Sequence, residues 1–165
     1  MVLDQPVQLV PYDPSWPERA AREIALVEGA IGAWLAGTVE HVGSTAVPRL
    51  EAKPTIDLMA PVRDLDEARE CFEPLAGIGY ANAPHRPYFH WFCKPSPAVR
   101  THHLVLIEPT HPEWRARLAF RDRLRSDREA AARYAELKRE LAARFPDDRE
   151  AYTDGKAGFV AEVSR

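Results

Sequence analysis

The run Thr55-Ile56-Asp57-Leu58-Met59-Ala60 constrains the fold of this chain more than any other segment. It is almost continuously apolar, and a strand of that kind is buried on both of its faces. We therefore expect a sheet that is covered by other elements on both sides. The carboxyl group of Asp57 is the one interruption of the run, so it is either satisfied within the fold or part of a functional site.

A turn at Gly43-Ser44 stands thirteen residues before Asp57 and follows a short predicted strand at residues 38–42. Such a turn presents backbone N–H groups and the Ser44 hydroxyl to any anion above it. If residues 38–42 pair with residues 55–60, Asp57 lies close to the turn. The pattern favours a phosphate-binding turn beside an acidic group. The alternative is a plain connector with a satisfied strand carboxylate.

The rest of the chain supplies further strands and then helices only. Strands are expected at residues 7–10, 77–81, 88–93 and 102–107, and helices at residues 15–35, 45–50 and 64–76. From residue 110 onward we expect three helices of about 14 to 17 residues. Capping residues are expected at Ser15, Thr110, Ser126 and Asp147. The prediction is an α/β (α+β) fold, with an α/β core over residues 7–109 and a C-terminal helical part over residues 110–165, packed as one compact unit.

The composition excludes several classes of protein. The net charge of −3 indicates no general nucleic-acid surface, so an anion site must come from the local placement of Lys and Arg. No apolar run approaches the roughly 20 residues that a membrane span needs. Residues 1–6 lack the basic start and apolar stretch of a signal peptide. Two cysteines do not form a disulfide framework, and a cytoplasmic location is expected.

Each of the three C-terminal helices places a cation on its apolar face. These cations are Arg121 and Arg125 in the first helix, Lys138 in the second and Lys156 in the third. Their stems could lie over the core while their charges reach water. Alternatively, they converge on anions, either carboxylates such as Asp57 or the phosphates of a ligand, because burying unpaired cations is costly.

Several motifs together resemble the GrpB family over about residues 7–163. These motifs are His41-Val-Gly-Ser-Thr-Ala-Val-Pro48, Ala52-Lys-Pro-Thr-Ile-Asp57, Arg100-Thr-His-His-Leu104, Phe120-Arg-Asp-Arg-Leu-Arg125, Tyr134 with Leu137-Lys138, and Asp148 with Tyr152 and Lys156. GrpB proteins belong to the DNA polymerase β-like nucleotidyltransferase superfamily. The resemblance implies a nucleotidyltransferase-like mixed sheet flanked by helices, with a three-helix C-terminal part that helps to hold a nucleotide. GrpB-like domains are also found fused to a kinase of coenzyme A biosynthesis, which implies a nucleotide-type ligand.

The resemblance also implies roles for individual residues. Ser44 and Asp57 would be catalytic, with Ser44 and the turn amides on the terminal phosphates of an NTP and Asp57 on Mg²⁺. The residues expected to bind the ligand or its phosphates are Gly43, Ser44, Thr45, Lys53, Arg121, Arg125, Lys138, Tyr152 and Lys156.

The chain departs from the family pattern at several positions. Nucleotidyltransferases hold Mg²⁺ with two or three carboxylates, but Thr55 and Met59 occupy the positions that share a strand face with Asp57. Arg49 stands where glycine usually follows the Val-Pro pair. Val105 stands where a second histidine commonly follows His-Leu. The usual set of acids is therefore incomplete.

Three options remain for Asp57. It could hold one Mg²⁺ that is bound mainly by ligand phosphates. With His41 and His103 it could form a mixed N/O site suited to zinc or another transition metal. It could also bind no metal and pair with Lys53 or a helix cation. Two functions stay open: nucleotidyl transfer from an NTP to an acceptor, and non-catalytic binding of a nucleotide- or coenzyme A-type small molecule.

Overall fold

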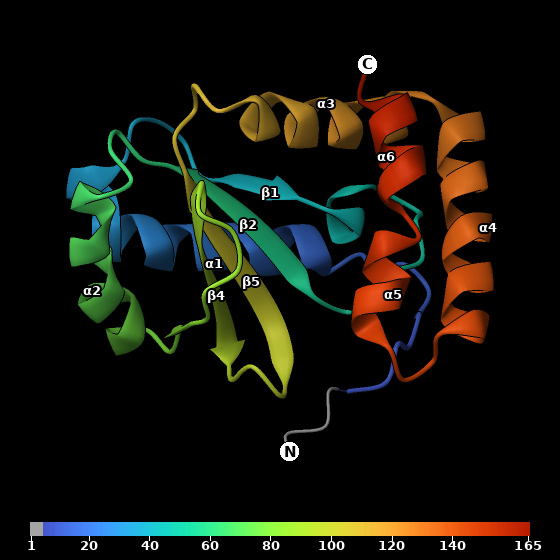
Figure 1. Ribbon diagram of the computed structural model, residues 1–165, viewed down its shortest axis with the longest axis horizontal. Helices are drawn as coiled ribbons and strands as arrows, with labels where there is room; N and C mark the ends of the chain where they lie inside the picture. The colour runs from blue at the N-terminus through green and yellow to red at the C-terminus, as the bar shows by residue number, and fades with distance from the viewer. Residues whose placement is uncertain (1–4) are drawn as a thin grey trace.

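A five-stranded mixed sheet forms the centre of the computed structural model, which describes residues 5–165 (Figure 1). Residues 1–4, on which part of the signal-peptide expectation rests, lie outside the described part. In spatial order the strands are β1 (Glu40–Val42), β2 (Ile56–Pro61), β5 (Arg100–Ile107), β4 (Phe89–Pro95) and β3 (Ala81–Asn82). β2 and β5 run parallel, and the other neighbours are antiparallel. The mixed sheet is confirmed.

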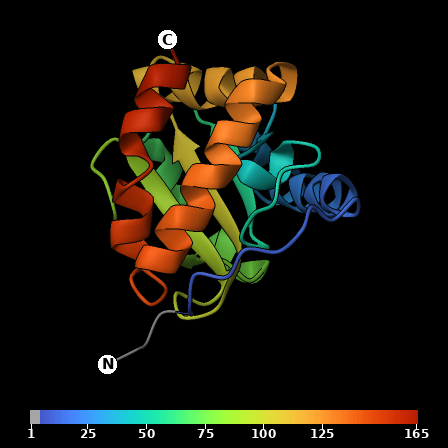
Figure 2. The same cartoon turned by 90° about the vertical axis from the view of Figure 1, so that its right-hand side faces the viewer.

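Helices cover both faces of β2, as its apolar sequence predicts. The helices are α1 (Trp16–Ile31), α2 (Phe72–Gly77), α3 (Pro112–Ser126), α4 (Arg128–Arg144), α5 (Arg149–Asp154) and α6 (Ala157–Val163). Leu58 packs in the cluster that includes α1, and Met59 packs on the opposite face in the cluster that includes Trp114 of α3. Figure 2 shows α4 and the α5–α6 pair on a different side of the molecule from α1. Within residues 5–165, no helix has the length and apolar character that crossing a membrane requires.

The prediction of one long third C-terminal helix is wrong. Two short helices, α5 and α6, are found instead, separated at Gly155-Lys156. Glycine is a poor helix former, so it weakens the helix at this point. It also lets α5 approach α4, since a Cβ atom built on Gly155 would lie 2.5 Å from Cδ2 of Leu141. The break makes Lys156 the residue that precedes α6.

Four other predicted elements are shorter than expected or absent. Residues 7–10 form a single bridge, Val10 with Ala52, instead of a strand. Only Ala81–Asn82 pairs in the third strand, after a turn at Gly79 with φ of +97°. The helix at 64–76 begins with a 3-10 segment, and only α2 is α-helical. Pro74 explains this, because it lacks the N–H that would continue an α-helical ladder from residue 70. A 3-10 turn at Ser44–Ala46 replaces the helix at 45–50.

Three of the four predicted capping residues are wrong by one position, and the fourth, Ser15, is the N-cap residue of α1 without a side-chain hydrogen bond. The side chains that accept the first helical N–H groups belong to His111, Asp127 and Asp148. At α1, Ser15 makes no side-chain cap, and the Asp13 carboxylate instead accepts the Ser15 N–H at 2.8 Å. The motif with a glutamate three residues later therefore located the starts of the helices but not the atoms that cap them.

A buried charged cluster lies between α1 and the sheet, on the face opposite Asp57. Glu23 is 5% exposed, accepts a 2.9 Å hydrogen bond from the Tyr80 hydroxyl and forms an ion pair with Lys94. Nε2 of His102 lies 3.7 Å from the same carboxylate. His102 thus points away from the face that carries His103, as strand alternation predicts. This cluster stabilises the docking of α1 and is separate from the candidate site.

Candidate functional site

The Gly43-Ser44 turn lies directly against the Asp57 carboxylate. β1 and β2 pair so that Val42 is opposite Asp57, which brings the turn to the start of β2. Gly43 has φ of +76° and ψ of −174°, a conformation that is essentially restricted to glycine. A Cβ atom at this position would lie 2.5 Å from Oδ2 of Asp57. The glycine is therefore required both by the backbone conformation and by the close approach of the carboxylate.

The residues after the glycine hold the turn in place. The Ala46 N–H donates to the Gly43 carbonyl at 3.1 Å, and the buried Thr45 hydroxyl donates to the Thr55 carbonyl at 3.1 Å. Because that hydroxyl has a single proton, Nε2 of His41 donates to it across 2.9 Å. Burial and the nearby arginines lower the pKa of His41 to about 4, so its ring is neutral at neutral pH. Thr45, expected to bind phosphate, instead anchors the turn to β2.

Asp57 pairs with His103 across the parallel strands. The two residues are register partners, and Nδ1 of His103 lies 2.8 Å from Oδ1 of Asp57. Desolvation raises the pKa of Asp57, but His103, Lys53 and His41 outweigh it and hold the pKa below its usual value. Asp57 is consequently a carboxylate that accepts the Nδ1 proton of His103.

The metal site expected from Asp57, His41 and His103 does not fit this geometry. His41 is the register partner of Leu58 and therefore lies on the opposite sheet face from Asp57 and His103. Two other acids, Glu40 on β1 and Glu108 after β5, could have completed a metal site. Glu40 instead pairs with Arg121, and Glu108 accepts the Leu65 N–H at 3.0 Å, so neither joins Asp57. Among residues 5–165, no three His, Cys, Asp or Glu side chains are grouped so that they could hold a metal ion.

Lys138 reaches the turn from α4. It is 1% exposed, and its Nζ donates to the Ser44 hydroxyl at 3.1 Å and to the Glu51 carbonyl. Its Nζ also lies 5.0 Å from the centre of the Tyr134 ring. Burial, followed by the charge of Lys156, lowers the pKa of Lys138 to about 7. The Glu51 carboxylate opposes this shift in the pKa of Lys138, but it forms its ion pair with Arg139, and within the described residues Lys138 forms no ion pair with a carboxylate.

Two further lysines share one aromatic ring beside Asp57. Nζ of Lys53 lies 5.1 Å and Nζ of Lys156 4.3 Å from the centre of the Tyr152 ring, which is 1% exposed. Burial and then the charge of Lys53 lower the pKa of Lys156 to about 8, although Asp57 opposes this. Tyr152, expected to contact the ligand, therefore supports the lysines from within the core. The structure brings Lys53, Lys138 and Lys156 together around the turn and Asp57.

The sequence predicts that the arginines of α3 join these lysines, but the structure places them elsewhere. Nη1 of Arg121 lies 2.6 Å from Oε2 of Glu40 and donates to the His41 carbonyl at 3.1 Å. Nε of Arg125 donates to the Ala46 carbonyl at 2.8 Å. Glu40 alternates with His41 and points toward α3, so it neutralises Arg121 before any ligand could. Both arginines attach α3 to β1 and to the turn.

Arg49 adopts a left-handed backbone conformation with φ of +67°. This explains the glycine expected at its position, because a residue with a Cβ atom is disfavoured there by about 1 kcal/mol. We predict that Arg49→Gly raises the free energy of unfolding by about 0.5–1 kcal/mol, measured by urea denaturation. Arg49→Ala, which keeps the Cβ atom and removes the charge, is the control. An equal gain in both variants would assign the effect to charge.

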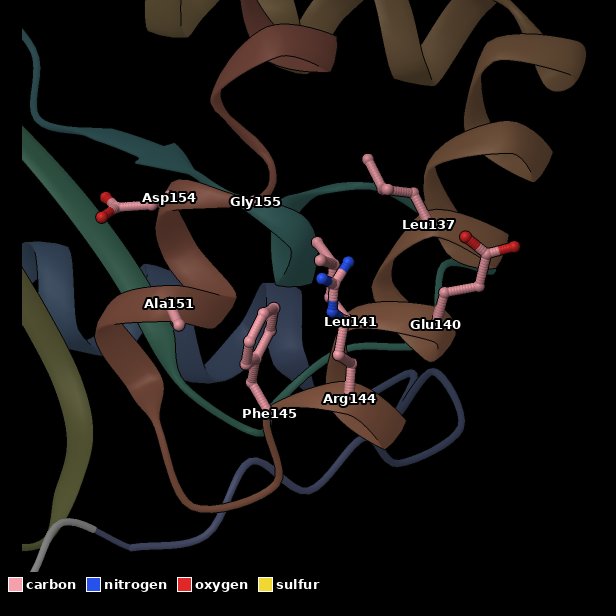
Figure 3. Close-up of a pocket in the computed structure, with 8 residues that line it drawn as sticks. All are labelled: Leu137, Glu140, Leu141, Arg144, Phe145, Ala151, Asp154 and Gly155. Atoms are coloured by element: carbon pink, nitrogen blue, oxygen red, sulfur yellow. The ribbon is translucent and has the colours of Figure 1, made fainter.

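Surface hollows elsewhere on the molecule do not contain these lysines. A groove between α4 and α5 is lined by apolar side chains that include Leu137, Leu141 and Phe145 (Figure 3). Glu140 and Arg144 of α4 and Asp154 of α5 also border it. A second, more polar hollow lies between α3, α4 and α6. Neither carries the convergent cations and hydroxyl found at the Gly43-Ser44 turn.

Comparison with known proteins finds relatives along nearly the whole chain. The GrpB protein family model matches residues 6–165. A UPF0157 protein of Pseudomonas aeruginosa is 38% identical over 165 residues, which is 97% of this chain and 67% of that protein. The crystal structure of conserved protein GrpB from Enterococcus faecalis superposes with a TM-score of 0.86 at 29% identity, covering 95% of this chain and 94% of that one.

Some relatives are much longer than this chain. The UPF0157 protein YqkA of Bacillus subtilis is 32% identical, and the match covers 93% of this chain but 45% of that protein. A dephospho-CoA kinase of Mycobacterium bovis is 45% identical over 83 residues, which is 48% of this chain and 20% of the kinase. The family model covers all but the first five residues of the chain. The chain therefore belongs to the GrpB family.

Proposed function

We propose that this chain binds a phosphorylated small molecule of nucleotide or coenzyme type between the Gly43-Ser44 turn and the three lysines. The observation that carries the proposal is Lys138, a buried ammonium group that contacts Ser44 and has no ion-pairing carboxylate within the described residues. A buried cation without a counter-charge is unfavourable. A ligand phosphate would supply the missing negative charge.

The neighbouring lysines strengthen this interpretation. Lys53 and Lys156 lie over the same tyrosine ring, and each lowers the proton affinity of a neighbour by repulsion. A bound phosphate would reverse that effect, because its charge favours the protonated form of every lysine around it. The match to part of a dephospho-CoA kinase agrees with a ligand that carries phosphates.

Nucleotidyl transfer from an NTP to an acceptor is the second candidate function. The position of Asp57 favours it, because the carboxylate lies against the Gly43-Ser44 turn. Mg²⁺ would then arrive with the triphosphate and find one protein carboxylate, since the described residues form no resident metal site. Binding without catalysis needs no further acid and is the function that the geometry supports better.

Isothermal titration calorimetry with ATP, GTP, CTP and coenzyme A, each with and without Mg²⁺, tests the proposal. We expect at least one of these ligands to bind, and Lys156→Met to weaken that binding at least tenfold by removing a charged contact with phosphate. Arg139→Met is the matched control, because Arg139 is an exposed cation of α4 that pairs with Glu51. It should change the affinity less than twofold.

The same titrations separate the two functions. Binding that requires Mg²⁺ and is lost in Asp57→Ala would favour nucleotidyl transfer. Binding that persists without Mg²⁺ and in Asp57→Ala would favour the non-catalytic module. If none of the four ligands binds, or if Arg139→Met weakens binding as much as Lys156→Met does, the cluster of lysines around the turn is not a phosphate site.

A further inference from the structure

The Nε2 atom of His103 is a buried polar atom without a hydrogen-bond partner, and no other side-chain atom of the described residues has this property. His103 lies on β5, with its side chain 21% exposed, and its ring packs against the Trp91 ring at a centroid distance of 5.1 Å. An unsatisfied buried group costs about 1–3 kcal/mol. Because Nε2 belongs to a residue that is bound to Asp57 in the proposed ligand site, we expect a ligand atom to be its hydrogen-bond partner.

The pairing with Asp57 determines which kind of partner Nε2 needs. Asp57 is a carboxylate and only accepts hydrogen bonds, so Nδ1 of His103 carries the proton in the 2.8 Å contact. A neutral imidazole that donates through Nδ1 has a lone pair at Nε2. In the neutral ring, the contact with Asp57 therefore selects the tautomer whose Nε2 accepts, and the partner that Nε2 lacks in this tautomer is a hydrogen-bond donor.

The surroundings restrict the donor further. Asp57, to which His103 is bound, also interacts with Lys53 and Lys156, so an ammonium-type donor would be repelled at this end of the cluster. Because Asp57 contacts His103 and also acts on Lys156, we expect the donor to belong to the same ligand as the phosphates that the lysines would hold. In a nucleotide, the neutral donors nearest to the phosphates are the hydroxyl groups of the sugar.

We propose that His103 is a hydroxyl-binding residue of the proposed ligand site, whose Nε2 accepts a hydrogen bond from a sugar hydroxyl of the ligand. Asp57 is its positioning residue, because it orients the ring and fixes the proton on Nδ1. The inference rests on the proposed phosphate site and adds to it a second contact that selects for the sugar. The pocket then distinguishes a nucleotide from phosphate or polyphosphate alone.

The test is a calorimetric comparison of ATP, 2′-deoxy-ATP, 3′-deoxy-ATP and inorganic tripolyphosphate in the full chain. In the wild-type protein, one of the two deoxy analogues should bind about five- to tenfold more weakly than ATP, because it lacks the hydroxyl that Nε2 accepts. In His103→Asn, ATP and that analogue should bind within twofold of each other. The asparagine amide can still donate to Asp57 but offers no acceptor at the position of Nε2.

Tripolyphosphate separates this inference from the proposed function. Its affinity should be equal in the wild-type protein and in His103→Asn, which also shows that the variant is folded. If tripolyphosphate binds and both deoxy analogues match ATP, or if the loss is the same in His103→Asn, the hydroxyl contact is refuted and the phosphate site stands. If ATP does not bind although GTP, CTP or coenzyme A does, the hydroxyl contact is refuted and the phosphate site stands. If none of these ligands binds and tripolyphosphate does not bind either, the phosphate site is refuted and the hydroxyl contact with it.

Discussion

Lys138→Met should make the stability of this protein markedly less dependent on pH. In the folded wild-type chain, burial and the charge of Lys156 hold the pKa of Lys138 near 7, whereas an unfolded lysine has a pKa of about 10.4. Between these values the unfolded state binds more protons, so wild-type stability rises with pH. Below about pH 7 both states are protonated and this contribution no longer changes.

The size of the effect follows from the width of that window. Where the unfolded state binds one full proton more than the folded state, the free energy of unfolding rises by about 1.4 kcal/mol per pH unit. Lys138 alone therefore contributes a rise on the order of 3 kcal/mol between pH 7 and pH 10. Methionine fills a similar volume without a charge. The free energy of unfolding of Lys138→Met minus that of the wild type should therefore be largest near pH 6 and fall steadily above pH 7.

Urea denaturation at one-unit steps from pH 6 to pH 10 measures this difference. Arg133→Met is the control, because Arg133 is an exposed cation of the same helix that pairs with Glu162, so its curve should run parallel to that of the wild type. A saturating phosphate ligand should flatten the wild-type curve by keeping Lys138 protonated. Parallel curves for Lys138→Met and wild type would mean that the buried amine titrates normally.

The fold was predictable where a segment's own sequence determines its environment. The apolar run at 55–60 indicates a strand buried on both faces, and β2 is the second strand of a sheet with helices on each side. The helix expected at residues 15–35 is also found, although its last residues form a 3-10 turn. The short strand predicted at residues 7–10 is not found, because whether a short segment pairs as a strand depends on the neighbouring segments in the fold.

The candidate site was predictable in its residues but not in their contacts. The predicted cations lie on α3 and α4, but Lys156 lies at the break between α5 and α6. Arg121 is neutralised by Glu40, which the sequence pattern alone does not reveal. The pairing of Asp57 with His103 depends on the parallel register of β2 and β5, which are 46 residues apart. Tyr134 was missed as a partner of Lys138, although its position four residues earlier on the same helix placed it on the same face.

Gly43→Ala should remove both stability and ligand binding, because two independent constraints meet at this residue. The φ of +76° with ψ near 180° is sparsely populated by residues that have a Cβ atom and costs on the order of 1–3 kcal/mol. The added methyl group would also lie 2.5 Å from Oδ2 of Asp57, a carboxylate that is held in place by His103. We expect a loss of about 2–4 kcal/mol in the free energy of unfolding and at least tenfold weaker ATP binding.

Gly29→Ala is the control for the substitution itself. Gly29 is exposed on α1, and a Cβ atom there meets nothing within 4 Å. Alanine at an exposed helical position should raise the free energy of unfolding by about 0.5–1 kcal/mol. Opposite signs for the two glycines would show that the Gly43 turn, and not glycine content in general, is the sensitive feature. A Gly43→Ala protein with wild-type stability and binding would refute the turn geometry.

A double-mutant cycle with Asp57→Ala separates the two constraints at Gly43. Removing the carboxylate relieves the contact at Oδ2 but leaves the backbone strain, so Gly43→Ala should be about 1–2 kcal/mol less destabilising in the Asp57→Ala background. An equal cost in both backgrounds would assign the whole effect to the backbone. A smaller cost would mean that Gly43 is needed at the turn largely because Asp57 lies beneath it, so the turn and the carboxylate form one structural unit.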